Sequence, residues 1–391
     1  MKDNQAKYPQ LRFKGFVDPW EERKLGDEVL IVMGQSPNSE NYTDNPNDHI
    51  LVQGNADMKN GHVLPRVWTT QVTKQAEKND LILSVRAPAG DIGKTAYDVV
   101  IGRGVAAIKG NEFIFQNLGK MKSDGYWTRY STGSTFESIN STDIKEAIIS
   151  IPTIEEQQKI GIFFNTLDDN ISLHQRKLNK LKELKQGYLQ KLFPRNGSKS
   201  PQLRFSGFAD AWEERKLGDL GSVAMNKRIF KEQTSDVGDI PFYKIGTFGG
   251  TPDAFISRDI FEEYKSKYQY PEVGDILISA SGSIGRTVVY RGDDEYFQDS
   301  NIVWLKHDQQ LDNSFLKQFY SIVKWQGLEG STIKRLYNKN ILETKITLPS
   351  PEEQAQLGSF FKQLDNTIAL HQRKLEKLQE LKKGYLQKMF C

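Results

Sequence analysis

The sequence predicts an α+β protein made of two similar mixed α/β domains, separated by a long antiparallel two-helix coiled coil and related by a pseudo-twofold axis. Two internal repeats support this prediction. Residues 151–193 and 348–390, which have a helical pattern, are identical at 27 of 43 positions at an offset of 197. Residues 9–27 and 201–219 are identical at 16 of 19 positions at an offset of 192. Repeats of this length indicate a duplicated architecture.

Composition sets the broad class. A chain of 391 residues with 37% hydrophobic and 26% charged residues is typical of a soluble globular protein with two or three domains. It has no apolar run of about 18 residues and no apolar N-terminal stretch, so we expect a cytoplasmic protein. Its one cysteine, Cys391, excludes a disulfide framework and a multi-cysteine zinc site. The net charge of +3 leaves nucleic-acid binding to depend on local clustering of basic residues.

The stretches between the repeats have diverged, but short common features remain. Residues 80–84 and 275–279 are similar apolar runs that predict a buried strand in each half. Residues 92–95 resemble 284–287, where a glycine turn precedes a β-prone segment. Both halves are therefore predicted to share one fold, in which the flanking segments are similar and the central segments have diverged. This pattern suits two domains that recognise different ligands.

The repeats also predict the domain boundaries. The capping-box pairs Thr153 with Glu156 and Ser350 with Glu353 mark the starts of two long helices. The first helix ends at Pro194, before a polar linker. The four predicted segments are a domain over 1–152, a helix over 153–195, a domain over 196–349 and a helix over 350–391.

Each long helix carries a heptad stripe, which predicts packing against a long partner, most simply the other copy. Antiparallel pairing is favoured because the linker reaches at most about 23 Å, while the first helix spans roughly 58 Å. The predicted packing residues are Leu167, Ile171, His174, Leu178, Leu181, Tyr188 and Leu192 in the first helix, and Leu364, Ile368, His371, Leu375, Leu378, Tyr385 and Met389 in the second.

Two further features of the helices allow alternative interpretations. His174 and His371 could bind a metal, but no histidine or cysteine lies nearby at ligand spacing, so a role in setting helix register is favoured. Gly187 and Gly384 each cost roughly 1 kcal/mol inside a helix. Either close approach of another backbone or simple duplication explains them.

No catalytic constellation is found in the sequence. Residues 88–95 resemble a phosphate-binding loop, but Pro88 occupies the position of its first glycine, so a strand-connecting turn is favoured. There is no Gly-x-Ser-x-Gly elbow and no Asn/Asp-Pro-Pro-aromatic run of the kind that amino-methyltransferases use. The sequence therefore predicts no catalytic residue and no metal site.

The doubled motifs together resemble the specificity subunit of a type I DNA restriction–modification system. They are Pro-Gln-Leu-Arg-Phe-x-Gly-Phe-x-x-x-Trp-Glu, a diverged domain, Gly-Ser-Thr at 133–135 and 330–332, and the heptad helix. This resemblance implies two target-recognition domains that each read one half of an asymmetric bipartite DNA site. It implies helices that set the spacer and dock two methyltransferase subunits, with motor/nuclease subunits completing the complex. S-adenosylmethionine, ATP and Mg²⁺ would be used by those partners, so this chain would bind no cofactor and would not be an enzyme by itself.

DNA-binding candidates follow from residue type and placement, because arginine and lysine contact guanine edges and phosphates. Lys120, Lys122, Tyr126, Trp127, Tyr130 and Trp325 could extend such a surface. The candidates are Arg86, Lys94, Arg103, Arg129, Ser134 and Thr135 in the first half, and Arg286, Lys324, Ser331, Thr332, Lys334, Arg335 and Lys339 in the second.

Two other functions remain open at this stage. One is a stand-alone nuclease or methyltransferase with a cryptic site, which the purified chain would reveal by turnover with DNA, Mg²⁺, ATP and S-adenosylmethionine. The other is a coiled-coil scaffold that binds only protein, which would show no salt-dependent DNA binding in the assembled complex.

Overall fold

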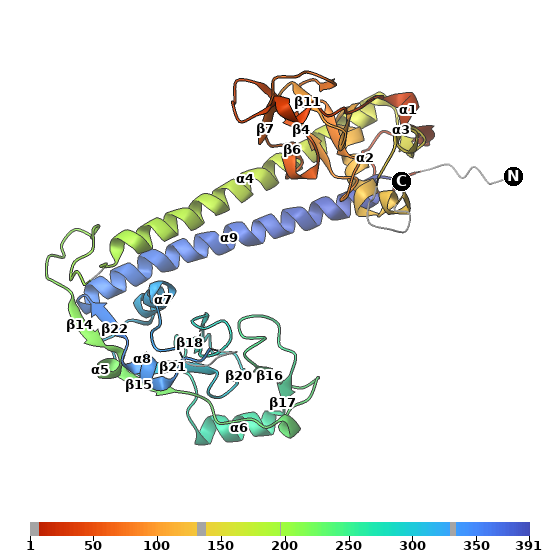
Figure 1. The fold of residues 1–391 in the computed structure, drawn as a ribbon. Coiled ribbons are helices and arrows are strands. Elements are labelled where there is room, and N and C mark those ends of the chain that lie inside the picture. The colour runs from red at the N-terminus through yellow and green to blue at the C-terminus, as the bar shows by residue number, and fades with distance from the viewer. Residues whose placement is uncertain (1–7, 131–137, 196, 329–333) are drawn as a thin grey trace. The chain divides into compact units, whose positions relative to one another are not determined.

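The computed structural model describes residues 8–130, 138–195, 197–328 and 334–391. It divides into two compact units: unit 1 comprises residues 1–175 and 373–391, and unit 2 comprises residues 176–372. The chain has two 39-residue helices, α4 (Ile154–Leu192) and α9 (Pro351–Met389). The first part of α4 and the last part of α9 belong to unit 1, and the remaining parts belong to unit 2. Figure 1 shows α4 in yellow-green and α9 in blue.

Unit 1 contains two larger sheets and one strand pair. The six-stranded sheet has the order β2 (Leu30–Met33), β12 (Val105–Lys109), β9 (Leu81–Ser84), β10 (Ile92–Lys94), β6 (His62–Val63) and β5 (Met58–Lys59). The five-stranded sheet has the order β3 (Tyr42–Thr43), β7 (Val67–Thr69), β4 (His49–Val52), β11 (Val99–Ile101) and β8 (Gln75–Ala76). β1 (Glu21–Lys24) pairs with β13 (Ile148–Ile151). The helices are α1 (Leu25–Glu28), α2 (Glu112–Ser123) and α3 (Ser141–Lys145), with 3-10 turns at Ser39–Asn41, Asn55–Asp57 and Tyr126–Tyr130.

Unit 2 repeats this plan with fewer strands. Its four-stranded sheet has the order β15 (Gly221–Ala224), β21 (Ile302–His307), β18 (Ile276–Ser279) and β19 (Thr287–Val289). A three-stranded sheet has the order β17 (Phe255–Ile256), β16 (Ile240–Tyr243) and β20 (Tyr296–Phe297), and β14 (Glu213–Lys216) pairs with β22 (Lys345–Leu348). The helices are α5 (Leu217–Leu220), α6 (Arg258–Lys267), α7 (Asn313–Ile322) and α8 (Asn338–Leu342), with a 3-10 turn at Lys231–Gln233.

The two buried strands expected at 80–84 and 275–279 are confirmed as β9 and β18, whose residues are all buried. Each is central, with an antiparallel neighbour on both sides: β12 and β10 in unit 1, β21 and β19 in unit 2. A strand buried on both faces favours apolar residues at successive positions, which explains the apolar runs that precede the buried Ser84 and Ser279.

The expected equivalence of residues 92–95 and 284–287 is wrong by three positions. The Ser84 N–H donates to Asp91 O at 2.7 Å, and the Ser279 N–H donates to Arg286 O at 2.9 Å. These bonds set an offset of 195, so Arg286 corresponds to Asp91 rather than to Lys94. The similar sequences Ile-Gly-Lys-Thr and Ile-Gly-Arg-Thr therefore occupy positions of the turn and strand that are not structurally equivalent.

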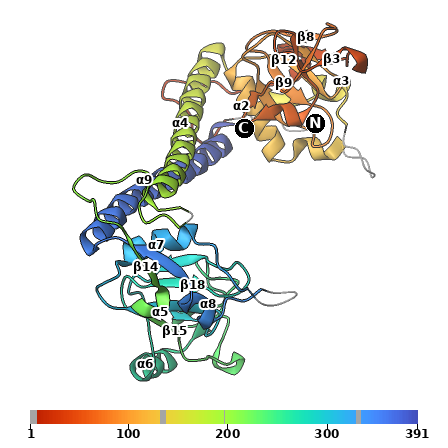
Figure 2. The same cartoon turned by 60° about the vertical axis from the view of Figure 1, so that its left-hand side comes forward.

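The long helices run antiparallel within each unit. In unit 1, Lys382 Nζ lies 2.6 Å from Asp168 Oδ1, and in unit 2, Lys185 Nζ lies 2.6 Å from Asp365 Oδ1. An edge-to-face ring pair accompanies each ion pair, with centroids 5.0 Å apart: Phe163 with Tyr385, and Tyr188 with Phe360. In each unit a later residue of α4 therefore pairs with an earlier residue of α9. The ribbons of the two helices lie side by side in both views (Figure 1, Figure 2).

The predicted heptad stripe lies on the less exposed face of each helix. Every predicted stripe residue, including His174 and His371, is buried or half-buried. By contrast, Leu173, Leu184, Leu370 and Leu381 are exposed. No group of three or more His, Cys, Asp or Glu that could hold a metal occurs within the described ranges.

The last residue of each helical repeat packs into an aromatic core. In unit 1, Phe390 stacks on Phe113 at 5.1 Å and meets Trp20 edge-on at 6.1 Å. In unit 2, Phe193 stacks on Phe315 at 5.3 Å and meets Trp212 at 6.0 Å. Each long helix therefore begins in one unit and ends in the core of the other.

The first repeat, at residues 9–27 and 201–219, holds both helices of each unit. The Leu11 N–H donates to Lys388 O near the end of α9 at 2.8 Å, and the Leu203 N–H donates to Lys191 O near the end of α4 at 2.9 Å. Each bond satisfies a carbonyl that the helix itself leaves without a partner. The next residue, an arginine in both copies, pairs with the start of the other long helix.

This arginine pair corrects the expected role of the capping-box glutamates. Both oxygens of the buried Glu156 accept bonds of 2.7 Å from Arg12. Glu353, also buried, accepts bonds of 2.8 and 2.7 Å from Arg204. The planar guanidinium matches a carboxylate with two parallel bonds, which outweighs a single bond to a cap N–H. The remaining half of the box is present in α9, where the Glu353 N–H donates to Ser350 Oγ at 3.3 Å.

No helix among the described residues is long and apolar enough to span a membrane.

Candidate nucleic-acid interface

Three chain segments meet at one edge of the main sheet in each unit. In unit 1, Ser84 at the end of β9 lies opposite Val105 at the start of β12. The loop after β9 and the turn before β12 therefore leave the sheet at the same edge. A third segment joins them where Ser138 bridges Arg86. We define the loop edge of unit 1 as residues 85–90, 102–104 and 138–139.

Unit 2 has the corresponding loop edge at residues 280–285, 299–301 and 335–336. There Ser279 lies opposite Ile302, and Ser281 bridges Arg335. The linking bonds are the same: the Val85 N–H donates to Gly104 O at 2.9 Å, and the Ala280 N–H donates to Asn301 O at 2.7 Å.

A buried serine anchors the first loop of each edge. The Ser84 hydroxyl lies 3.0 Å from Arg86 O and 3.2 Å from Pro88 O. The equivalent Ser279 hydroxyl donates to Ser283 O and accepts from the Arg286 N–H at 2.9 Å. Because these serines are almost fully buried, water does not compete for their hydrogen bonds, and the bonds hold the loop backbone in place.

A glycine and a tryptophan then close each loop. Gly90 and Gly285 have φ values of 89° and 85°, a region that a side chain rarely adopts. A Cβ at Gly90 would lie 2.5 Å from Trp127 Cδ1, and one at Gly285 would lie 2.9 Å from Trp325 Nε1. Trp127 is 3% exposed, so it belongs to the core instead of the basic and aromatic surface that its sequence neighbours suggested.

Five of the sequence-predicted residues lie at the loop edges or close beside them. Arg86 and Arg103 are exposed at the edge of unit 1, and Arg335 is exposed at the edge of unit 2 with Lys334 directly before it. Lys324 is exposed one residue before Trp325, which covers the unit 2 loop. Ser134, Thr135, Ser331 and Thr332 lie outside the described residues, as does the side chain of Arg129.

Three other predicted residues lie elsewhere or are held by other groups. Lys339 is exposed on α8. Arg286 donates from Nη1 to Phe248 O at 2.8 Å. Lys94 lies at the opposite end of β9 from Arg86, because it pairs with Leu81.

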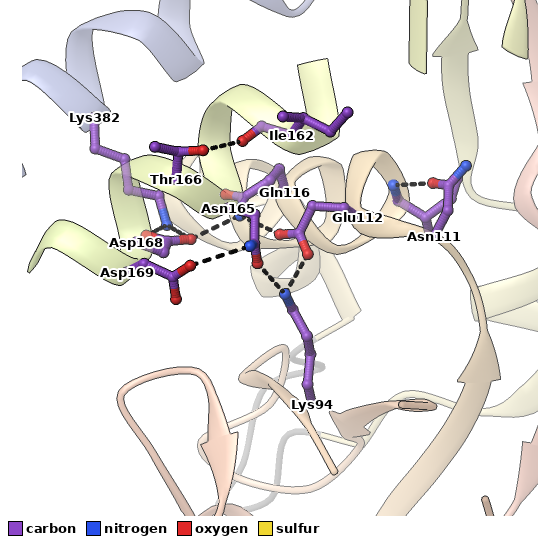
Figure 3. A network of polar contacts seen from close by, with 11 residues as sticks. Lys94, Asn111, Glu112, Gln116, Ile162, Asn165, Thr166, Asp168, Asp169 and Lys382 are labelled. Carbon is purple, nitrogen blue, oxygen red and sulfur yellow. Dashed lines mark hydrogen bonds and ion pairs between the residues drawn. The ribbon is translucent and has the colours of Figure 1, made fainter. Parts of the chain in front are cut away.

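Lys94 belongs to a polar network that joins β10, α2 and α4 (Figure 3). Its ammonium pairs with Glu112 and lies 3.4 Å from Asn165 Oδ1. Gln116 then donates to both Glu112 and Asp168 at 2.8 Å, and Asp168 completes the chain at Lys382. These contacts give Lys94 an architectural role in unit 1.

The basic residues of α2 are also engaged within unit 1. Lys120 pairs with Asp124 at 2.6 Å, and Lys122 pairs with Asp91. Partial burial lowers the pKa of Lys122. Since Asp91 follows Gly90 directly, this pair ties α2 to the loop after β9.

The loop edges present guanidinium, ammonium, hydroxyl and amide groups, which donate hydrogen bonds to phosphates and base edges. Sequence reasoning found the arginines but missed the serine, glycine and tryptophan that hold their loops. The two copies of Leu/Ile-x-Leu/Ile-Ser followed six residues later by Gly, with Ser84 and Gly90 in one and Ser279 and Gly285 in the other, carried this signal. The match of residues 92–95 to 284–287 obscured this pattern, because that match requires an offset of 192 and the structurally equivalent residues are 195 positions apart.

Comparison with known proteins places this architecture in a family. A family model for the type I restriction modification DNA specificity domain matches the chain twice, over residues 17–183 and 209–380. A Haemophilus influenzae protein named as a type I restriction enzyme specificity subunit is 57% identical over 157 residues, 39% of this chain and 41% of that protein. The MjaX specificity subunit of Methanocaldococcus jannaschii is 31% identical over 176 residues, 43% of this chain and 41% of that protein.

These two alignments span about two fifths of each relative. The MjaIX specificity subunit of the same archaeon aligns over 348 residues, 80% of this chain and 77% of that protein, at 23% identity. Among solved structures, the S subunit of a type I restriction–modification system from M. genitalium superposes with a TM-score of 0.70 at 16% identity. That match covers 98% of this chain and 99% of the other, and it shows a shared fold.

Proposed function

Because this chain belongs to the family of type I restriction–modification DNA specificity subunits, we propose that it is the non-catalytic subunit that reads an asymmetric, bipartite DNA site. Each unit reads one half of that site through its loop edge. The paired helices set the unread spacer between the half-sites.

One observation carries the proposal: the same edge is built twice on a matched frame but presents different side chains. The buried serine, the positive-φ glycine and the covering tryptophan recur at Ser84 and Ser279, Gly90 and Gly285, and Trp127 and Trp325. The exposed residues between them differ. A frame that stays constant while its exposed groups change suits two readers of unlike sequences.

Catalysis in this proposal belongs to other subunits. Two methyltransferase subunits dock on the helices and use S-adenosylmethionine, while motor/nuclease subunits use ATP and Mg²⁺. The exposed leucines of the helices, Leu173 and Leu184 on α4 and Leu370 and Leu381 on α9, support docking because they lie off the buried stripe. Exposed apolar residues in a row are typical of helix–helix interfaces.

A module exchange tests the proposal. Residues 28–132 would be replaced by the corresponding segment of a relative, and the methylated motif would be mapped genome-wide in a strain that carries the partner subunits. We expect one half-site to change while the other half-site and the spacer stay as they were. The matched exchange of residues 220–336, which takes in the whole loop edge of unit 2, should change only the other half-site.

A change in both half-sites after a single exchange would contradict the modular assignment. Turnover of DNA by the purified chain with Mg²⁺, ATP and S-adenosylmethionine would instead favour a stand-alone enzyme. DNA binding by the assembled complex that is absent or insensitive to salt would favour a protein-binding scaffold.

A further inference from the structure

The bridges at the two loop edges use the same pair of residue types in opposite order. In unit 1, Arg86 on the β9 loop lies opposite Ser138 on the returning segment. In unit 2, Ser281 on the β18 loop lies opposite Arg335 on the returning segment. Each unit therefore has one arginine and one serine at this bridge. The arginine lies on the loop after β9 in unit 1 and on the returning segment in unit 2.

The backbone equivalence of the two bridges is set by a neighbouring hydrogen bond. The Ile139 N–H donates to Val85 O at 2.9 Å, and the Leu336 N–H donates to Ala280 O at 2.8 Å. Arg86 follows Val85 as Ser281 follows Ala280, and Ser138 precedes Ile139 as Arg335 precedes Leu336. The exchange is thus a difference in side chains on one shared backbone arrangement.

The same alternation turns both arginines away from the core. Val85 and Ile139 are each 2% exposed, and Ala280 and Leu336 are 2% and 3% exposed. Successive side chains of an extended segment point to opposite faces, so Arg86 and Arg335, each next to one of these core residues, face outward. Arg86 and Arg335 are accordingly exposed. Ser281 differs, because it is 6% exposed and its hydroxyl donates to Asn301 Oδ1 at 2.7 Å.

Neither guanidinium is neutralised by the surrounding described structure. Several other arginines are held in ion pairs, among them Arg12 with Glu156 and Arg258 with Asp294. Within the described ranges, no ion pair or side-chain hydrogen bond is made by the guanidinium of Arg86 or Arg335. Each of these arginines therefore combines a backbone position fixed by neighbouring hydrogen bonds with a guanidinium that is free to bind a ligand.

We propose that Arg86 and Arg335 are the specificity-determining arginines of the two units, and that each reads a guanine edge in its own half-site. This inference rests on the proposed function and names the residues through which it acts. A guanidinium fits guanine O6 and N7 with two bonds, the commonest specific contact to a base. Directly opposite residues of an antiparallel pair have Cβ atoms about 5 Å apart. The exchange therefore shifts the Cβ that carries the guanidinium by more than the 3.4 Å rise of one base pair.

Binding of the assembled methyltransferase complex to a panel of duplexes, each with one substituted base pair, tests the proposal. Arg86→Ser should lower discrimination at one G·C pair of the unit 1 half-site by about 10-fold to 100-fold. The unit 2 half-site should be unaffected. Arg335→Ser should give the reverse result. Arg23→Ser is the matched control, because Arg23 is exposed on β1 beside Glu21 and away from the loop edge.

A conservative variant and an exchange variant sharpen the test. Arg86→Lys keeps the charge but loses the two-bond fork, so it should retain affinity and lose the guanine preference. The double variant Arg86→Ser with Ser138→Arg should recover discrimination at a neighbouring base pair. Equal melting temperatures would establish that each variant is folded.

Two outcomes would overturn the inference. Equal weakening on every duplex, with a salt dependence reduced by about one phosphate contact, would make Arg86 a backbone contact. Unchanged discrimination in Arg86→Ser would remove it from recognition altogether. Either result is separable from failure of the proposed function, because the exchange of residues 28–132 tests that function without relying on Arg86.

Discussion

At the residue scale, the loop edges depend on positions where only glycine fits. Gly90 and Gly285 combine a positive φ with a tryptophan close to the missing Cβ. Gly187, inside α4, has neither constraint, since nothing lies within 4 Å of its Cβ position among the described residues. Glycines in the same protein are therefore retained for different reasons.

Alanine at these positions should change stability in opposite directions. Gly90→Ala should lower the free energy of unfolding by about 2 kcal/mol, because a positive φ is strained for alanine and Trp127 must move. Gly187→Ala should raise it by roughly 1 kcal/mol, since alanine is the better helix former. Urea denaturation of the two variants measures both values. Stabilisation by Gly90→Ala would contradict the role of the turn.

The pairing of Arg12 with Glu156 is a second residue-scale feature with a measurable effect. Removing one partner leaves the other buried without compensation, so Glu156→Gln should lower the free energy of unfolding by about 3 kcal/mol. The double variant Arg12→Met with Glu156→Leu should lose less than Glu156→Gln alone. Chemical denaturation gives the values, and an equal or larger loss in the double variant would argue against a desolvated pair.

Individual residue roles were the hardest to predict from sequence. The spacing of Glu156 after Thr153 fits a capping box, yet the carboxylate is taken by Arg12, 144 positions away. The arginines of the loop edges could be nominated by type, and their grouping could not, because it depends on three segments meeting at one sheet edge. Lys94 and Arg86 are eight positions apart in sequence and lie at opposite ends of β9.

At the scale of elements, α4 and α9 make the same kind of ion pair in both units but contact a different neighbouring helix in each. A half-buried aspartate receives a lysine from the other helix in both units: Lys382 at Asp168, and Lys185 at Asp365. The second donor differs, because α2 supplies Gln116 and α7 supplies Lys317. The seam is therefore shared, while each domain makes its own connection to it.

These contacts predict a pH dependence for unit 2. Burial raises the pKa of Asp365, but the hydrogen bonds from Lys185 and Lys317 outweigh it, so the pKa lies below its ordinary value. A lowered pKa means that the unfolded state binds the proton first, so stability is present above the unfolded pKa near 4 and is lost as pH falls through the lower folded value. Asp365→Asn should cost about 2 kcal/mol at pH 7 and progressively less as the pH falls below about 4.

The measurement is the free energy of unfolding from urea titrations between pH 3 and pH 7. Asp169→Asn serves as the control, because Asp169 is an exposed aspartate on the other long helix, α4. A cost for Asp365→Asn that stayed constant across this range would contradict the ion-pair account.

Among the elements, length and burial decided what could be predicted. The long helices were evident because a 39-residue periodic pattern has few competing interpretations. β9 and β18 were evident because strands buried on both faces are continuously apolar. Two-residue strands such as β5, β6 and β8 have no period of their own. They exist only through the partners that tertiary packing brings to them.

At the scale of the whole molecule, the proposed function makes helix length a determinant of the DNA site. Inserting seven residues at the midpoint of α4 and seven at the midpoint of α9 keeps the heptad seam in register. Each helix then lengthens by about 10 Å, so we expect an unread spacer longer by roughly three base pairs. Both half-site sequences should be unchanged, and methylation-site mapping reads all three quantities together.

Insertion into α4 alone is the control, since it breaks the seam and should destabilise the chain. An unchanged spacer after the paired insertion would remove the helices from the setting of distance, while leaving the recognition role of the loop edges intact.

The placement of Phe390 has a consequence for synthesis on the ribosome. Unit 2 is a continuous segment, residues 176–372, and can close as soon as it emerges. Unit 1 cannot, because Trp20 and Phe113 pack against a residue that is made after all of unit 2. At about 5–20 residues per second, more than 200 further residues take roughly 10–40 s to translate. The domain that is translated first is the last to be completed, and its aromatic core awaits the final helix during that interval.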